Sequence, residues 1–172
     1  MSLLAQIFAS LDEDEDGTAW SDAVPVRWMR EDCNFVLEDY AADAAQADFG
    51  AAIEAFLRID DATFAAAAAD VFAYYRRMHA LHEKHGLPSP RIDDPAQVWQ
   101  HVQFGSEAYA SRYRDGRVRI SLECNCDWEQ EHGLQLVFTH EGRICKVGPF
   151  DGHLSHADAY ADPSLETVVY PH

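Results

Sequence analysis

The sequence is short of cysteine and of long apolar runs, and each shortage excludes a class of protein. Only four cysteines occur in 172 residues, so the chain lacks the dense cysteine pattern of a secreted disulfide scaffold. No apolar run reaches the roughly 18 residues of a membrane helix, and no basic segment followed by an apolar one marks a secretion signal. We therefore expect a cytoplasmic protein with reduced thiols.

Basic side chains are also scarce, at 13 against 30 acidic ones, which gives a formal net charge of −17. Such a charge disfavours nucleic acid and anionic membranes as partners, because both are bound through cationic side chains that neutralise phosphates. It favours a basic protein partner, which the negative field would steer towards the chain. The length and the 48% apolar content allow one well-buried core, so we predict a single domain over residues 1–172.

The first half of the chain is predicted to hold a β-hairpin followed by two helices. Residues 20–28 and 33–37 are rich in apolar side chains at strand spacing and form the predicted hairpin. Pro25 cannot donate a ladder hydrogen bond, which places the first strand at a sheet edge. Apolar residues three and four apart then predict a helix from Asp48 and a long second helix over residues 62–85.

The second half, about residues 96–172, is predicted to form a five-stranded antiparallel meander packed on these helices. Residues 117–127 alternate apolar and polar side chains, which is the period of a half-buried strand. Glycine-containing dipeptides predict turns at residues 105–106, 115–116 and 141–142. The second of these turns sets Tyr113 opposite Val118. With the helical half, about residues 1–88, the sheet half makes an α+β fold.

Two clusters resemble metal sites, and in both a structural interpretation is preferred. Residues 12–17 place carboxylates and a glycine as a calcium loop does, but Ala23 stands where the closing glutamate belongs. A solvated acidic turn is therefore favoured. His79, His82 and His85 are three residues apart, whereas the zinc-binding helix motif needs histidines four apart.

The cysteines of the second half are predicted to be core residues. The turn at 141–142 sets Phe138 opposite Cys145, so Cys124, Cys126 and Cys145 would all face the core as free thiols, which behave as small hydrophobes. A metal site built from Cys124, Cys126 and His132 would lack a fourth ligand at motif spacing. Neither a metal nor another cofactor is predicted.

Four arginines are predicted to gather on one face of the hairpin at residues 115–116: Arg112, Arg114, Arg117 and Arg119. Like charges this close repel one another, so acidic groups should lie beside them. One interpretation is an internal set of carboxylates, from residues 12–16 or from the C-terminal tail. The other is a site for an anion or an acidic partner.

Two predicted loops, residues 127–133 and 148–156, carry the candidate binding residues Trp128, Glu129, Glu131, His132, Phe150, Asp151 and His153. Two antiparallel strands separate the loops and return the chain to the same end, so the aromatic and histidine side chains should line one exposed rim. Carboxylates beside histidines can serve acid–base catalysis. No nucleophile or oxyanion donor is identifiable with them, so no catalytic residue is assigned.

The segments SLECNCDWEQEHGLQLVF, KVGPFDGHLSHADAY and SLETVVY resemble an uncharacterised bacterial domain family with a CxWxxEHGLQLVF…VGPFDGH motif. The resemblance implies an α+β domain with no assigned chemistry, some of whose members look like immunity proteins encoded beside polymorphic toxins. It carries over no catalytic residue. The matching positions are Cys126, Trp128, His132, Gly133, Gly148, Asp151 and Gly152.

Two functions follow as hypotheses. The first is a non-enzymatic binding protein, an immunity protein whose acidic surface neutralises a basic toxin domain. The second is a small metal-dependent or acid–base hydrolase that uses Glu131, His132, Asp151 and His153. The net charge and the missing nucleophile favour the first, and a bound metal would favour the second.

Overall fold

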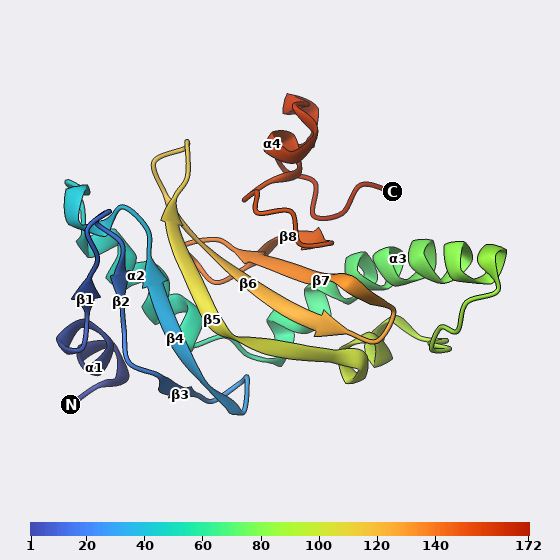
Figure 1. The fold of residues 1–172 in the computed structure, drawn as a ribbon, viewed down its shortest axis with the longest axis horizontal. Coiled ribbons are helices and arrows are strands. Elements are labelled where there is room, and N and C mark those ends of the chain that lie inside the picture. The colour runs from blue at the N-terminus through green and yellow to red at the C-terminus, as the bar shows by residue number, and fades with distance from the viewer. The chain divides into compact units, whose positions relative to one another are not determined.

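The computed structural model describes residues 1–172 and has the α+β fold that the sequence predicts (Figure 1). The α-helices are α1 (Leu3–Ala9), α2 (Ala47–Leu57), α3 (Asp61–His85) and α4 (His156–Tyr160). The strands are β1 (Asp12–Glu13), β2 (Ala19–Trp20), β3 (Val24–Val26), β4 (Glu31–Leu37), β5 (Val102–Arg112), β6 (Val118–Cys126), β7 (Glu129–Phe138) and β8 (Ile144–Gly148). Three short 3-10 helices are η1 (Tyr40–Ala42), η2 (Pro95–His101) and η3 (Pro163–Leu165).

The strands form one eight-stranded sheet in the order β1-β2-β4-β5-β6-β7-β8, with β3 paired to β4 beside this path. The pairs β1–β2, β2–β4 and β3–β4 are antiparallel, whereas β4 and β5 are parallel, with Val36 opposite Tyr109 and Leu37 opposite Ala110. Parallel neighbours cannot be joined by a tight turn. The segment between them, residues 38–101, supplies the long connection and contains α2 and α3.

The predicted N-terminal hairpin is present in a shorter form. Strand β3 pairs with β4 from Val24 opposite Cys33 to Val26 opposite Glu31. Pro25 lies in β3, and this strand pairs with β4 alone, so the proline occupies the edge position that its missing amide hydrogen requires.

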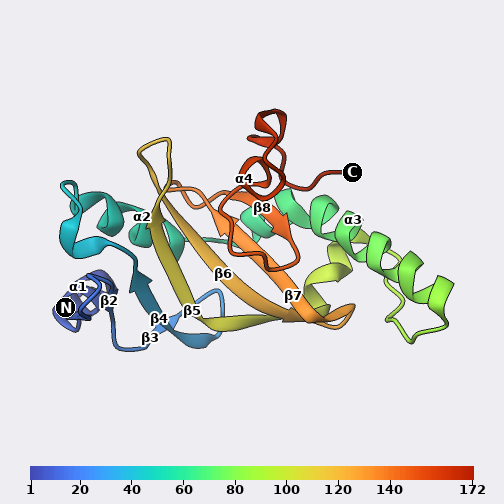
Figure 2. The ribbon, with the colours of Figure 1, turned by 45° about the horizontal axis from the view of Figure 1, so that its top comes forward.

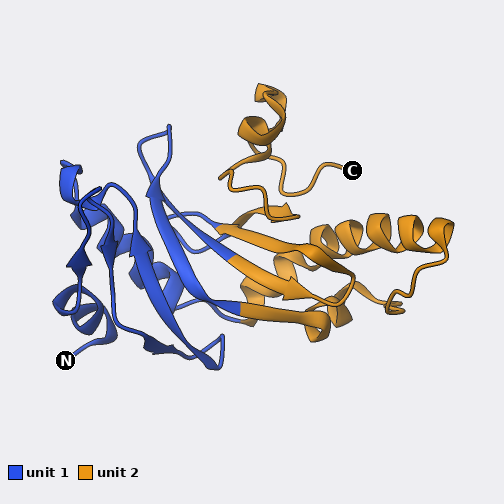
Figure 3. Ribbon diagram, viewed as in Figure 1, with its two compact units in different colours: residues 1–60, 105–122, 138–143 blue, residues 61–104, 123–137, 144–172 orange.

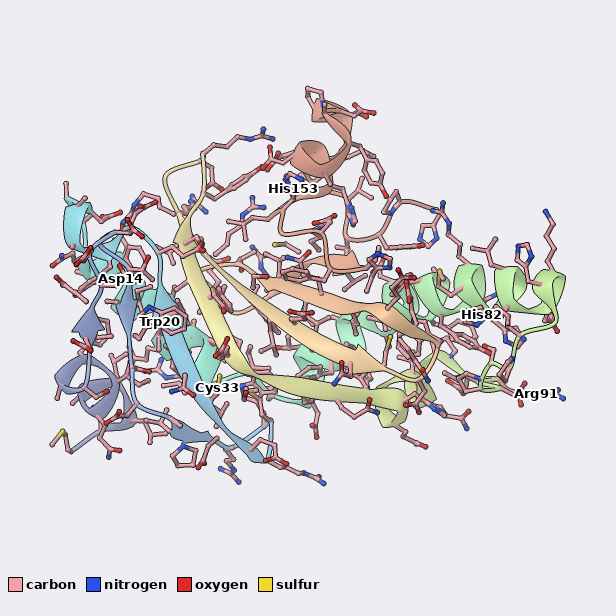
Figure 4. All side chains as sticks on the ribbon, in the orientation of Figure 1. Asp14, Trp20, Cys33, His82, Arg91 and His153 are labelled. Carbon is pink, nitrogen blue, oxygen red and sulfur yellow. The ribbon has the colours of Figure 1, made fainter.

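The acidic segment at residues 12–17 forms part of a second hairpin, between β1 and β2. One oxygen of Asp14, Oδ1, accepts backbone hydrogen bonds from Asp16 at 3.0 Å and from Thr18 at 2.9 Å. An Asp side chain that bonds the backbone two residues later closes a turn. Figure 4 shows Asp14 in this turn, at the end of β1.

Both predicted helices are confirmed, and they begin within one residue of the expected positions. Helix α2 buries Phe49, Ala52, Ile53 and Phe56 on one face. The Phe56 ring packs edge-on against Phe35 at a centroid distance of 5.7 Å, which fixes α2 on the sheet. Helix α3 spans 25 residues and is followed by Gly86 in the left-handed conformation, with φ +65°.

The predicted first strand of the meander is wrong, because residues 95–101 form η2 instead. Asp94 caps this turn by accepting a hydrogen bond from the Ala96 amide at 2.8 Å. The Trp99 indole donates to the Phe64 carbonyl of α3 at 3.1 Å, which holds the segment on the helix. Strand β5 then runs through residues 105–106 without the predicted turn.

The other two predicted hairpins exist, but each is shifted by one residue. The Tyr113 amide donates to the Arg117 carbonyl, and the Thr139 amide donates to the Arg143 carbonyl, both at 2.8 Å. Each loop therefore contains three residues rather than two, and its last residue, Gly116 or Gly142, has φ +80°. A three-residue loop that ends in a left-handed glycine is the next common hairpin after the two-residue form.

This shift changes which side chains face the core. Ala108 and Ala110 of β5 are wholly buried, whereas Tyr109, predicted to face the core, is half-buried. Cys124 and Cys126 are buried as predicted, but Cys145 is only half-buried. A one-residue slip exchanges the two faces of a strand, which accounts for both differences.

The chain divides into two compact units, each assembled from three segments (Figure 3). Unit 1 comprises residues 1–60, 105–122 and 138–143, and unit 2 comprises residues 61–104, 123–137 and 144–172. In unit 2, α3 packs against η2 and β8, and its last turns extend beyond the β6–β7 turn (Figure 2). No helix combines the length and the apolar character needed to cross a membrane.

Candidate functional site

Trp128 does not lie on an exposed rim, and this prediction is wrong. Only Asp127 and Trp128 connect β6 to β7, so the predicted long loop is a tight turn. The Trp128 side chain is 0% exposed and contacts Tyr74 and Tyr75 of α3, each at a ring-centroid distance of 6.0 Å and nearly edge-on. Trp128 is therefore an aromatic anchor between the sheet and α3.

Glu129, Glu131 and His132 belong to the first residues of β7. The Nδ1 atom of His132 lies 3.1 Å from Oε2 of Glu129, and Oε1 of Glu129 accepts the Glu131 amide at 2.8 Å. Burial acts to raise the pKa of the Glu129 carboxyl, but the hydrogen bonds from the Glu131 and His132 amides and from the His132 ring hold it below its usual value. Glu129 is thus a fixed carboxylate that orients an exposed imidazole.

This pair has the geometry of a histidine base held by a carboxylate. Acid–base chemistry on a covalent pathway also needs a nucleophile within hydrogen-bond reach of the histidine. The contacts of the His132 ring are with Glu129, and no serine, threonine or cysteine is among them.

A glycine fixes the position of the Glu129–His132 pair. Gly133 has φ +60°, and a Cβ atom there would lie 2.4 Å from the Cys124 carbonyl oxygen of β6. The Tyr74 hydroxyl donates to the Gly133 carbonyl at 2.9 Å. Only glycine allows this close approach of two backbones, so the kink in β7 and its contact with α3 both depend on it.

Asp151 and His153 meet at a residue that the sequence analysis missed, Lys146. This lysine is 0% exposed, and its Nζ donates to Gln135 Oε1 at 2.6 Å, to Asp151 Oδ1 at 2.5 Å and to the His153 carbonyl at 3.1 Å. Burial lowers the pKa of Lys146, and the Asp151 carboxylate offsets this only in part. The one signal in the sequence was a lysine inside an otherwise apolar strand.

The same residues also fix the position of the segment that follows β8. Asp151 Oδ1 also accepts the His153 amide at 2.8 Å, and Gln135 Nε2 donates to the His153 carbonyl at 3.1 Å. The Phe150 amide donates to the His132 carbonyl at 3.0 Å, so the two predicted loop segments do meet. Phe150 is 39% exposed, and His153 is exposed on the segment before α4 (Figure 4).

His156 is a second buried polar group that the sequence analysis missed. Its Nε2 atom lies 3.0 Å from the carbonyl oxygens of both Val147 and Val169, and its ring stacks on Tyr160. Burial lowers the pKa of His156. In the neutral imidazole, Nε2 donates its one hydrogen towards these two carbonyl oxygens, and this joins β8 to the C-terminal segment.

The predicted arginine cluster is divided between different partners. Arg112 bonds both carboxylate oxygens of Asp43, at 2.5 and 2.9 Å, and also Asp48 at 2.9 Å. The hydrogen bonds from Arg112 lower the pKa of Asp43. The carboxylates bonded to Arg112 thus come from residues 43 and 48, which lie outside the two predicted sources, residues 12–16 and the C-terminal tail.

The other three arginines differ in exposure. Arg119 is buried and lies 3.6 Å over the Tyr113 ring, with Asp115 at 3.5 Å. Arg114 and Arg117 are exposed, and Arg114 also lies over Tyr113, at 5.2 Å. A shared cationic face is therefore not formed by the four.

The other candidate metal ligands are separate from one another. His79 Nδ1 lies 2.9 Å from the Ser89 hydroxyl, and its Nε2 lies 3.6 Å from Glu83. Within residues 1–172 no group of three or more histidine, cysteine, aspartate or glutamate side chains is arranged to hold a metal ion. Burial raises the pKa of Cys126 to about 12, although hydrogen bonds to its sulfur act in the opposite direction.

Comparison with known proteins gives a family but no characterised relative. No curated protein and no solved structure matches the chain. A family model matches residues 7–154, which include both the Glu129–His132 pair and the Lys146 cluster. The chain therefore belongs to the family described as Domain of unknown function (DUF6985).

Proposed function

We propose that the protein is a non-enzymatic binding protein of the cytoplasm, an immunity protein that neutralises a basic toxin domain. The observation that carries this proposal is the excess of negative charge. If each of the 13 basic side chains paired with one acidic side chain, 30 − 13 = 17 acidic side chains would remain without a cation. Such a surface attracts a basic partner over a range set by the Debye length.

Two basic groups that are buried or partly buried also have internal partners, and this strengthens the argument. Lys146 is neutralised by Asp151, and Arg112 by Asp43 and Asp48. Buried charges that are paired in this way contribute little to the outer field. The field around the protein is therefore set by its exposed charges, among which the carboxylates outnumber the basic groups.

The arrangement of the predicted loop residues also supports binding over hydrolysis. Asp151 bonds a buried lysine and a backbone amide, and Glu129 bonds two backbone amides and His132. Both carboxylates therefore make hydrogen bonds that stabilise the fold. The immunity role itself rests on the family resemblance together with the charge.

The test is co-expression of this chain with the basic products of the genes beside it. A stable complex that relieves toxicity is expected, with an association rate that falls as salt shortens the Debye length from about 10 Å to about 3 Å. His132→Ala should neutralise the toxin as well as the native chain. Loss of neutralisation in His132→Ala with an unchanged complex would instead favour the hydrolase, and absence of any basic partner would refute the proposal.

A further inference from the structure

Unit 1 has one sheet face that α2 does not cover. Trp20, Val36 and Tyr109 lie side by side across β2, β4 and β5 and share this face, whereas Phe35 faces α2 from the other side. In Figure 1, α2 lies behind β4, so the viewer looks onto the sheet face that α2 does not cover.

The aromatic pair on this face is only partly buried. Val36 is 1% exposed beneath its neighbours, but Trp20 remains 40% exposed, and its ring meets Tyr109 edge-on at 6.4 Å. Figure 4 shows Trp20 on β2 beside β4. A tryptophan that stays partly exposed on a sheet face is available to a partner, and tryptophan is enriched among the residues that contribute most to binding.

Carboxylates surround these rings. Asp12 is the pairing neighbour of Trp20 on β1, Glu107 accepts the Tyr109 hydroxyl at 2.8 Å, and Glu38 accepts the Ser111 hydroxyl. All three carboxylates are exposed. We call Asp12, Trp20, Glu38, Glu107 and Tyr109 the acidic aromatic face.

Two arginines of unit 1 lie near this face. Arg112 lies on the same strand as Tyr109 but is bonded to Asp43 and Asp48. Arg119 is buried against the Tyr113 ring. The exposed charged side chains of the acidic aromatic face itself are its three carboxylates.

We propose that the acidic aromatic face is the docking surface for an arginine-bearing segment of the basic protein partner. A guanidinium group stacks on aromatic rings and pairs with carboxylates through two hydrogen bonds, so this face offers both of its preferred contacts. A second copy of this acidic chain would bring like charges together, and nucleic acid would be repelled in the same way. The inference rests on the proposed function and adds the location and the chemistry of the contact.

The experiment compares two double variants that remove the same charge. Glu38→Gln with Glu107→Gln changes the acidic aromatic face, and Glu83→Gln with Glu131→Gln changes two exposed carboxylates of unit 2. A deca-arginine peptide is titrated into each by calorimetry at low salt, and the thermal midpoint checks the fold. The face variant should bind about fivefold more weakly or worse, and the control within about twofold of the native chain.

Trp20→Ala tests the aromatic contribution with the charge unchanged, and it should weaken binding of the peptide about tenfold. The same variants are then measured with the protein partner found by co-expression. The inference would be overturned if the two double variants lost the same affinity and if Trp20→Ala, still folded, bound as tightly as the native chain. That result would leave the proposed function in place. Failure of the native chain to bind any basic peptide or protein would instead remove the proposed function.

Discussion

Replacing Asp151 with alanine should destabilise the fold more than removing the lysine that it neutralises. Lys146 is 0% exposed and cannot reach water, whereas the Asp151 side chain is 33% exposed. Asp151→Ala therefore leaves a buried cation with only Gln135 and a carbonyl as partners. Lys146→Met leaves a carboxylate that water can solvate.

The expected magnitudes follow from this asymmetry. Breaking a buried ion pair on one side costs about 3–5 kcal/mol, and the partial exposure of Asp151 reduces this to about 2–3 kcal/mol of unfolding free energy. Lys146→Met should cost about 1 kcal/mol, since a side chain of similar length fills the site. The double variant should resemble Lys146→Met, so adding Lys146→Met to Asp151→Ala should restore stability.

Urea unfolding at two pH values measures this effect. The folded-state pKa of Lys146 lies below its ordinary value of 10.5, so between these two values the unfolded chain binds more protons than the folded chain. Stability then rises as pH rises through that window. Asp151→Ala removes the carboxylate that raises the pKa of Lys146, so the folded-state pKa falls further and the pH window extends to lower pH. The loss of unfolding free energy should therefore be greatest near neutral pH and smaller near pH 10.

The assay is the urea midpoint at each pH. With a slope of about 2 kcal/mol per molar urea, Asp151→Ala should lower the midpoint by about 1 M at neutral pH. Equal midpoints for Asp151→Ala and Lys146→Met, or a further loss in the double variant, would show that Lys146 is not held as a buried cation.

Three further predictions concern buried residues of unit 2. Trp128→Ala should lower the unfolding free energy by about 3–5 kcal/mol, as calorimetry or urea unfolding will show, because the indole is wholly buried. Gly133→Ala should destabilise the protein by at least about 2 kcal/mol more than Gly152→Ala, since both positions have positive φ but only Gly133 would place a Cβ against Cys124; similar urea midpoints would contradict this. The lowered pKa of His156 means that the unfolded chain takes up more protons as pH falls through 6.5, so the native chain should lose stability between pH 7 and pH 5, and His156→Gln should lose less.

The sequence predicted the elements that depend on local periodicity. Helix α3 was found because its apolar stripe, its first acidic turn and Gly86 agree. The hairpin loops were found but their registers were not, because Gly116 suits both a two-residue and a three-residue loop. Which form occurs depends on which face packs on a helix, and a single strand pattern does not contain that information.

The candidate site was harder to predict, because its key contacts join residues that are distant in sequence. Lys146 reads as an exposed strand residue until Gln135 and Asp151 are brought beside it. Trp128 reads as a loop residue until Tyr74 and Tyr75 cover it. In both cases the tertiary environment reverses the exposure that residue type and local context suggest.

The parallel pairing of β4 with β5 has a consequence for how the chain folds. Phe35 and its partner Ala108 are 108 − 35 = 73 residues apart, whereas the hairpin after β5 closes a three-residue loop. Closing the longer loop costs about 3 kcal/mol more in chain entropy, so the hairpins should form early and β4 should join them late. During synthesis β4, complete at residue 37, has no full β5 to pair with until residue 110 has been made, which leaves one edge of the N-terminal strands open while 110 − 37 = 73 residues are added.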